Sequence, residues 1–339
     1  MKKLISILLA LMLVLGLGAC GTANNESSAP SKTHNGNEIT KLDVDCNVYG
    51  IKGPTGVGMV SLMKKAENGN ANLNYKFNMV GANEEIVAKI ANKEADIAAV
   101  ATNLASTLYA KTNGGISVLA INTLGVLCVV TKGVEINSIS DLKGKTVYTT
   151  GQGANPEYIT KYILEKNGLT VGTDVTLEFK AEPTELVAQV VSNENAIVIA
   201  PQPVATSITV KDTNAKIALD MNDEWEKVSD TKLVMGCVIA RNEFIEENPE
   251  AVKVFLKEYE ESINAVNSDV VTAAALCENY GIVTPAAIAK KAIPYCNIVY
   301  RDGKDLKTDL SAYLQFLFDK APASVGGALP SDGFYYEAK

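Results

Sequence analysis

Histidine is almost absent from this chain of 339 residues, which has one, His34, in a polar stretch near the N-terminus. A Ser-His-Asp triad, a Cys-His dyad and a His-rich zinc site all need histidine, which is also the commonest general base. His34 has no second histidine or cysteine nearby, so we interpret it as a solvated linker residue. We therefore expect no catalytic residue, no metal site and no cofactor.

Positively charged residues are also fewer than negatively charged ones. The chain has 31 Lys and Arg against 39 Asp and Glu, a net charge of −8. A nucleic-acid partner would need a basic stripe to follow the phosphates. The balance therefore argues against a nucleic-acid partner.

Closely spaced cysteines are missing. No Cys-x-x-Cys spacing occurs, so a zinc ribbon or redox motif is unsupported. Two of the cysteines, Cys277 and Cys296, could pair, but sequence alone does not place them within bonding distance. Three others lie in apolar, strand-like runs, where cysteine behaves as a small buried residue, and these are Cys46, Cys128 and Cys237. We expect free thiols in the mature chain.

A long uncharged apolar run rich in leucine lies at the N-terminus. It covers residues 4–19 after Lys2 and Lys3, which is short for a membrane-spanning helix of about 20 residues and fits a secretory signal. It ends in Leu17-Gly18-Ala19-Cys20, which resembles the bacterial lipobox. The resemblance implies a signal peptide over 1–19 and lipid acylation of Cys20. The alternative is an ordinary secretory signal with an incidental cysteine.

The segment after Cys20 is almost entirely small or polar. Residues 21–40 show no apolar periodicity, which is typical of a flexible linker. We therefore expect 20–40 to be a lipidated tether that holds the protein on the extracytoplasmic face of the cell membrane.

The remaining 300 residues or so alternate strands with helices. The pattern runs from Asp43 to Ile121 and begins again at Thr146, which predicts an α/β fold with two lobes. Two long apolar strands, near 124–131 and 233–240, suggest two crossings between the lobes. We expect lobe 1 to comprise 41–125 and 241–339, and lobe 2 to comprise 126–240.

Four loops that open helices carry the candidate ligand contacts: 53–58, 101–103, 149–155 and 201–203. Each is expected to present backbone N–H groups and the positive end of a helix dipole, and their side chains are neutral. This chemistry suits a small polar, anionic or heterocyclic ligand. Including two aromatic residues that could stack on a ligand, the candidates are Tyr49, Thr55, Gly56, Thr102, Asn103, Thr149, Gly151, Gln152, Gly153, Asn155, Gln202 and Trp225.

Four short motifs support a family resemblance that covers about residues 41–339. They are Gly-Pro-Thr-Gly-Val-Gly at 53–58, Asn-Lys-Glu-Ala-Asp-Ile-Ala at 92–98, Ile-Ser-Asp-Leu-Lys-Gly-Lys-Thr-Val at 139–147 and Asn-Pro-Glu-Ala at 248–251. With these the chain resembles bacterial ABC-transporter solute-binding lipoproteins, in particular the nitrate/sulfonate/taurine and thiamine-precursor-binding group.

The resemblance implies a two-lobed periplasmic-binding-protein fold of type II. Each lobe would be a mixed sheet flanked by helices, with two hinge crossings, and the lobes would close on a small molecule and deliver it to an ABC permease. The ligand loops depart from the family, because they contain no Arg or Lys to clamp a sulfonate and no acid to hold an amine.

Two alternatives to the transport receptor stay open. One is a ligand-sensing or surface-presenting lipoprotein. The other is an extracellular enzyme, which the missing histidine disfavours. We expect a monomer.

Overall fold

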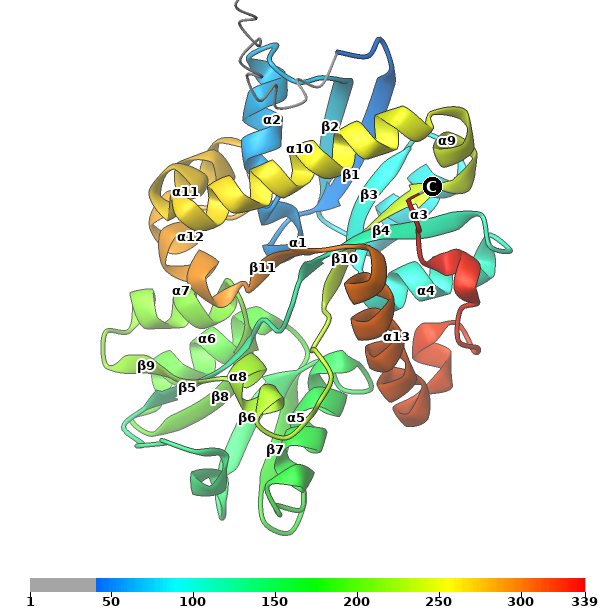
Figure 1. The fold of residues 1–339 in the computed structure, drawn as a ribbon. Helices are drawn as coiled ribbons and strands as arrows, with labels where there is room; N and C mark the ends of the chain where they lie inside the picture. The colour runs from blue at the N-terminus through cyan, green and yellow to red at the C-terminus, as the bar shows by residue number, and fades with distance from the viewer. Residues whose placement is uncertain (1–40, 339) are drawn as a thin grey trace, which may run out of the picture. The chain divides into compact units, whose positions relative to one another are not determined.

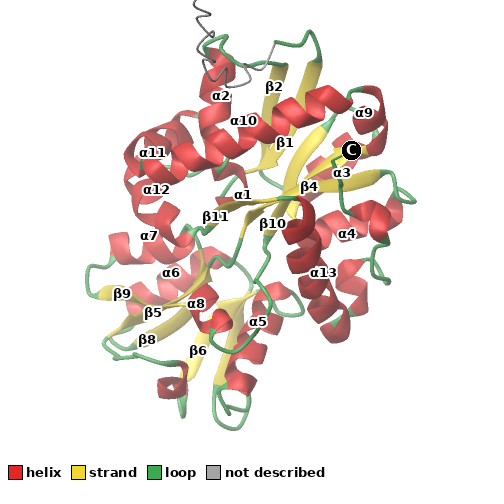
Figure 2. Cartoon of the chain, in the orientation of Figure 1, coloured by secondary structure: helices red, strands yellow, loops and turns green. Residues whose placement is uncertain are grey.

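The structure, a computed structural model, describes residues 41–338, which form two β-sheets flanked by helices (Figures 1 and 2). The expected signal peptide, the acylated Cys20, the tether and His34 lie outside the described residues. No helix in the described part is both long and apolar enough to span a membrane.

The first sheet has six strands in the order β11-β4-β10-β3-β1-β2. Its strands are β1 (Asp45–Ile51), β2 (Asn74–Val80), β3 (Ile97–Ala101), β4 (Ile116–Thr123), β10 (Gly236–Arg241) and β11 (Ile298–Arg301). β1 runs parallel to β2 and β3, whereas β10 runs antiparallel to β3 and β4. The sheet is therefore mixed, as the family resemblance implies.

The second sheet has five strands in the order β7-β6-β8-β5-β9. Its strands are β5 (Leu127–Lys132), β6 (Thr146–Thr150), β7 (Thr176–Lys180), β8 (Ala196–Pro201) and β9 (Ala215–Asp220). β6 is parallel to β7 and β8, and β5 is antiparallel to β8 and β9.

Helices cover both sheets (Figure 2). The α-helices are α1 (Pro54–Val57), α2 (Val60–Glu67), α3 (Asn83–Ala91), α4 (Thr102–Lys111), α5 (Asn155–Lys166), α6 (Pro183–Ser192), α7 (Val204–Lys211), α8 (Met221–Glu226), α9 (Asn242–Glu247), α10 (Pro249–Ser268), α11 (Val270–Asn279), α12 (Ala286–Ala292) and α13 (Gly303–Lys320). The 3₁₀ turns are η1 (Ile139–Leu142), η2 (Ile293–Tyr295), η3 (Pro322–Val325) and η4 (Asp332–Phe334).

The two lobes contain related units. The segment β2-α3-β3-α4 in the first lobe corresponds to β7-α6-β8-α7 in the second, and residues recur between them at a constant spacing. The identical pairs are Glu85 and Glu185, Val87 and Val187, Ala88 and Ala188, Glu94 and Glu194, Ile97 and Ile197, Ala105 and Ala205, and Lys111 and Lys211. The loops that follow β3 and β8 are therefore equivalent positions.

The chain crosses between the sheets twice. It passes from the end of β4 through 124–126 into β5, and returns from α8 through 227–235 into β10. β10 pairs with β3 and β4, so it belongs to the six-stranded sheet, although we expected lobe 2 to run to residue 240. The predicted apolar strands start three residues late, at Leu127 and Gly236. The apolar run could not reveal this, because the preceding connections are also buried.

The core includes a long amphipathic helix that the sequence predicted correctly. α10 begins at Pro249 and buries Val252, Phe255, Tyr259 and Ile263 at helical spacing. All five described cysteines are free and buried, as expected.

A buried polar cluster closes the amino-terminal end of β3. The Asp96 carboxylate accepts hydrogen bonds from the backbone N–H and side-chain amide of Asn47 at 2.9 and 2.8 Å, and it pairs with Arg241 at 2.7 Å. Asp96 is 6% exposed. Because its partners satisfy it fully, removing the carboxylate would leave buried donors unpaired.

We predict that Asp96→Ala lowers the free energy of unfolding by about 3 kcal/mol, since breaking a buried pair by removing one partner costs about that much. The check is the midpoint of urea unfolding. Asp45→Ala is the control, because Asp45 pairs with Lys76 at the surface and should leave the midpoint nearly unchanged. Equal shifts for both variants would contradict the assigned role of Asp96.

Candidate functional site

The candidate loops lie at the edges through which the two sheets are connected. β4 runs parallel to β1 and β3, so its end at Thr123 lies at the edge where those strands end. β5 begins beside the end of β8, with Leu127 opposite Pro201. The crossings therefore join the carboxyl-terminal edges of both sheets. Ligands bind at this edge in open α/β sheets.

In this conformation several candidate side chains are hydrogen-bonded inside the protein. Thr102 is fully buried and its hydroxyl donates to the Val234 carbonyl at 2.8 Å. The buried Thr149 hydroxyl donates to the Ile199 carbonyl at 3.0 Å. These two threonines fasten chain segments together and do not present free hydroxyls.

The buried Gln202 is also bonded internally. Its carbonyl oxygen accepts from the Thr206 hydroxyl at 2.8 Å, and its amide donates to the Cys128 sulfur at 3.4 Å. Gln202 therefore stabilises the start of α7, a role typical of a side chain at a helix N-terminus.

Trp225 lies in an aromatic cluster and not at an open surface. It is 1% exposed, and its indole N–H donates to the Thr231 carbonyl at 2.7 Å. Its ring packs on Tyr162 of α5 and Phe316 of α13, with centroids 4.7 and 5.0 Å away. With these contacts Trp225 has an ordinary role in aromatic packing.

Several backbone N–H groups that we expected the loops to offer are already bonded. Gly53 donates to Ile282, Thr102 to Met235, and Gln202 to Val126. Ala154 donates to Gly151. The helix N-termini at this edge therefore have fewer free donors than their sequence pattern suggests.

Glu157 is a residue of this edge that was not predicted from the sequence. This carboxylate reaches back from the first turn of α5 and accepts from the Gly153 N–H, and it pairs with Lys161. Burial opposes its ionisation, but the Gly153 N–H and the Lys161 ammonium outweigh burial, so the pKa of Glu157 is lowered. The available signal was a glutamate two residues after Asn155, at the third helical position, where such a side chain can cap. A negative charge therefore occupies the start of α5.

The remaining candidates keep polar surface at this edge. Gln152 is exposed, while Tyr49, Thr55 and Asn103 are half-buried. Gly151 and Gly153 have φ of 77° and 72°, which glycine adopts without strain. Of the other two, Asn155 is 8% exposed, and a Cβ on Gly56 would approach the Ile51 carbonyl to 2.6 Å.

A buried side chain of β4 fixes the 53–56 loop. The Asn122 amide donates to the Thr55 carbonyl at 3.1 Å and to the Tyr259 hydroxyl at 2.9 Å. Asn122 could not be predicted from the sequence, because nothing local shows that it contacts a loop 67 residues earlier in the chain.

The first crossing is held by side chains from both lobes. The Gly125 N–H donates to the Asn222 side-chain oxygen at 3.1 Å, and the Asn297 amide donates to the Gly125 carbonyl at 2.6 Å. A Cβ on Gly125 would lie 2.8 Å from both Asn222 and Leu233, so only glycine fits. Nearby, burial raises the pKa of Asp220 above its usual value.

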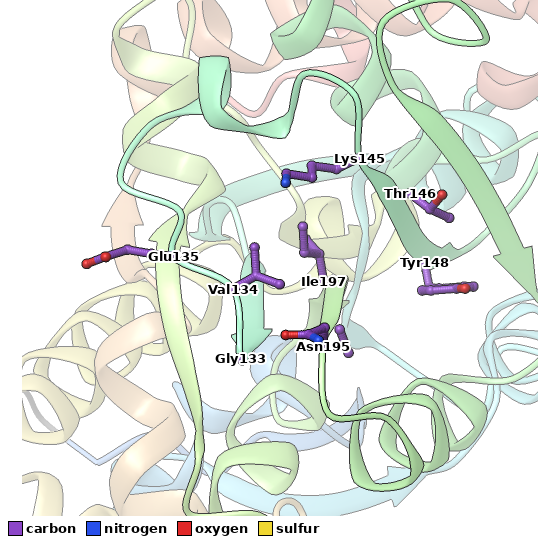
Figure 3. A pocket seen from close by; sticks show the side chains of 9 residues that line it. Gly133, Val134, Glu135, Lys145, Thr146, Tyr148, Asn195 and Ile197 are labelled. Carbon is purple, nitrogen blue, oxygen red and sulfur yellow. The ribbon is translucent and has the colours of Figure 1, made fainter.

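A cavity of about 600 Å³ lies at the opposite end of the second sheet (Figure 3). It separates the amino-terminal ends of β6 and β8, which pair only at Tyr148 and Val198. In the first lobe Asp96 closes the equivalent position, which is Ala196 here. The cavity is therefore remote from the candidate loops. Within residues 41–338, no cluster of His, Cys, Asp or Glu could hold a metal ion.

Solved structures with the same fold include transport proteins. An ABC transporter from Parabacteroides distasonis is 20% identical, covers 88% of this chain and 100% of its own, and has a TM-score of 0.74. The periplasmic aliphatic sulphonate binding protein of Escherichia coli is 12% identical over 88% and 94%, with a TM-score of 0.68. The alkanesulfonate-binding protein of Xanthomonas axonopodis pv. citri, bound to MOPS, is 11% identical over 85% and 95%, with a TM-score of 0.55.

These likenesses confirm the expected two-lobed α/β fold, type II of the periplasmic binding proteins. No curated protein sequence matches the chain. The family model described as NMT1/THI5 like matches residues 69–269, which is more than half of the 339 residues. The chain therefore belongs to the NMT1/THI5-like family.

Proposed function

We propose that this protein is the extracytoplasmic solute-binding receptor of an ABC importer. The observation that carries the proposal is the meeting of the two carboxyl-terminal strand edges at the crossings, which puts polar loops of both lobes on facing edges. A ligand between such edges contacts both lobes at once. Its binding would then favour a closed arrangement, which a membrane permease could distinguish from the open one.

The crossings are suited to act as the hinge. The first crossing covers only 124–126 and the second covers 227–235. Both are bonded to residues of both lobes, Gly125 to Asn222 and Asn297, and the second crossing through Val228 to Trp225 and Met235 to Thr123. Bending there would move the lobes as bodies, because the strands on either side are hydrogen-bonded into two separate sheets. We place lobe 1 at 41–125 and 236–338, and lobe 2 between them.

We further propose that the ligand is a neutral polar molecule, such as a heterocycle, and not a sulfonate. Two of the similar structures bind sulfonates by name. In this chain the four loops contain no Lys or Arg, and the ionised Glu157 already occupies the start of α5. An anion placed there would meet the like charge of the Glu157 carboxylate.

The membrane attachment follows from the N-terminal sequence. We propose that Cys20 is acylated after removal of residues 1–19, and that the protein acts as a monomer on its tether beside the permease. More than one lipid chain is needed for stable anchoring. Removal of residues 1–19 takes away Lys2 and Lys3, so the net charge changes from −8 to −10, and this charge would keep the body away from an anionic membrane surface.

The binding role predicts that a small molecule stabilises the protein. A thermal-shift screen of vitamins, pyrimidines, amino acids and sulfonates should reveal a stabilising ligand, because ligand at a hundredfold excess over Kd adds about 2.7 kcal/mol. Gln152→Ala and Thr55→Ala should then weaken binding by about tenfold each, measured by calorimetry.

Gln315→Ala is the matched control, because Gln315 is an exposed glutamine on α13 that bonds to Asp319. It should bind like the unmodified protein. Unchanged affinity in both Gln152→Ala and Thr55→Ala would show that the binding loops are assigned incorrectly, and a screen without any stabilising compound would oppose the receptor itself.

The negative charge of Glu157 should make the site prefer a neutral ligand over an anionic one. Glu157→Gln removes the negative charge but keeps a hydrogen-bond acceptor for Gly153, so affinity for ethanesulfonate should rise by about tenfold, roughly 1.4 kcal/mol. Glu165→Gln, at the exposed end of the same helix, removes the same charge and should change nothing. If the unmodified protein already binds sulfonates tightly, the neutral-ligand proposal fails.

Lipid anchoring should depend on the sulfur atom of Cys20. Cys20→Ser keeps the apolar signal but removes the thiol that would be acylated. The variant should lose incorporation of labelled palmitate and leave the membrane fraction, whereas the unmodified protein is labelled and sediments with membranes. A variant that still carries label would contradict acylation at Cys20.

A further inference from the structure

A second cavity, of about 300 Å³, lies between the two lobes but outside the candidate loops. One wall comes from α7 and β9 of the second lobe, through Thr206, Thr209, Lys216 and Ile217. The other wall comes from α12 and η2 of the first lobe, through Lys291 and Tyr295. Both lobes therefore contribute to it.

The lining is basic and contains no acid. Lys216 and Lys291 are both exposed, and neither forms an ion pair with any residue in 41–338. This contrasts with Lys132 nearby on β5, whose ammonium pairs with Asp212 at 2.8 Å. Other exposed lysines, such as Lys211 and Lys290, are also unpaired within the described part of the chain, but Lys216 and Lys291 come from different lobes and line one cavity.

Hydrogen-bonding groups accompany the two charges. The Tyr295 hydroxyl has no hydrogen-bond partner among the described residues, so it is free to donate. The hydroxyls of Thr206 and Thr209 already donate to the Gln202 side chain and to the Thr206 carbonyl, so they have no proton left to donate to a ligand. The donors that remain are two ammonium groups and one phenol.

Tyr295 also ties this cavity to the packing between lobes. The residue belongs to η2 of the first lobe, yet its ring packs against the core cluster of the second lobe that includes Ile208 and Ala215. The cavity wall is therefore set by an apolar contact between lobes. Lys216 and Lys291 lie across that boundary from each other.

We propose that this cavity is a second binding site, which takes a small free oxyanion such as sulfate or phosphate and bridges the lobes. An oxyanion can accept charge-assisted hydrogen bonds from both ammonium groups and a hydrogen bond from the Tyr295 hydroxyl. The net charge disfavours approach to an anionic membrane, so the ligand is free in solution.

The bridging geometry has a consequence for the lobes. An anion held by Lys216 of one lobe and Lys291 of the other binds better when the two lysines surround the cavity than when the lobes are apart. By linkage, the anion favours the arrangement in which the cavity exists. The site thus senses an anion that is not the transported ligand, through residues outside the four candidate loops.

The test is titration calorimetry with sodium sulfate and with inorganic phosphate, in sodium chloride at matched ionic strength. The full soluble chain, residues 21–339, should bind one anion. Lys216→Ala and Lys291→Ala should each raise the Kd by about tenfold or more, the size expected for a lost charge-assisted hydrogen bond. Tyr295→Phe, which keeps the ring packing, should weaken binding less.

Lys290→Ala is the matched control, because Lys290 is exposed in the same last turn of α12 but does not line the cavity. It should bind the anion normally. Equal weakening in Lys290→Ala would mean a general charge effect and would overturn the site. Dependence on one lysine alone would overturn the bridge, and no binding by the unmodified protein would overturn the proposal.

Discussion

The arrangement of the molecule depends on how Gly125 is held at the first crossing. Its N–H and carbonyl are bonded to asparagine side chains of opposite lobes, Asn222 and Asn297, and a Cβ would collide with Asn222 and Leu233. The chain can therefore leave the first sheet only along one path. Because that path joins the carboxyl-terminal edges of both sheets, it decides which loops face one another, and hence where a ligand could contact both lobes.

At the same carboxyl-terminal edge, N–H groups and side chains of the candidate loops are already hydrogen-bonded within the protein. Thr102 bonds to the second crossing through both its N–H and its hydroxyl, and Gln202 bonds to Thr206 and to the first crossing. These two residues occupy equivalent positions in the related units of the two lobes. Their shared role is to anchor a crossing, since unpaired polar groups in so buried a position would be costly. A ligand is then left to the more exposed residues of the edge.

The two regions between the lobes differ in the charge of their side chains. At the start of α5 the protein supplies its own carboxylate, Glu157, which satisfies Gly153 and counters the helix dipole. At the cavity beside α12 the opposite holds, since Lys216 and Lys291 meet without an acid. The first arrangement suits a neutral molecule and the second suits an anion, although the two lie in one chain with an excess of acidic residues.

The sequence by itself determined the alternation of strands and helices, the two lobes and the amphipathic helix from Pro249, because periodicity and local capping depend on near neighbours. It also excluded histidine chemistry in the body. The strand starts at Leu127 and Gly236 and the use of Thr149 and Trp225 in packing were decided only by tertiary structure. Each of those depends on contacts with distant residues, such as the bond from Thr149 to Ile199, and no local pattern records which partner a buried polar group will find.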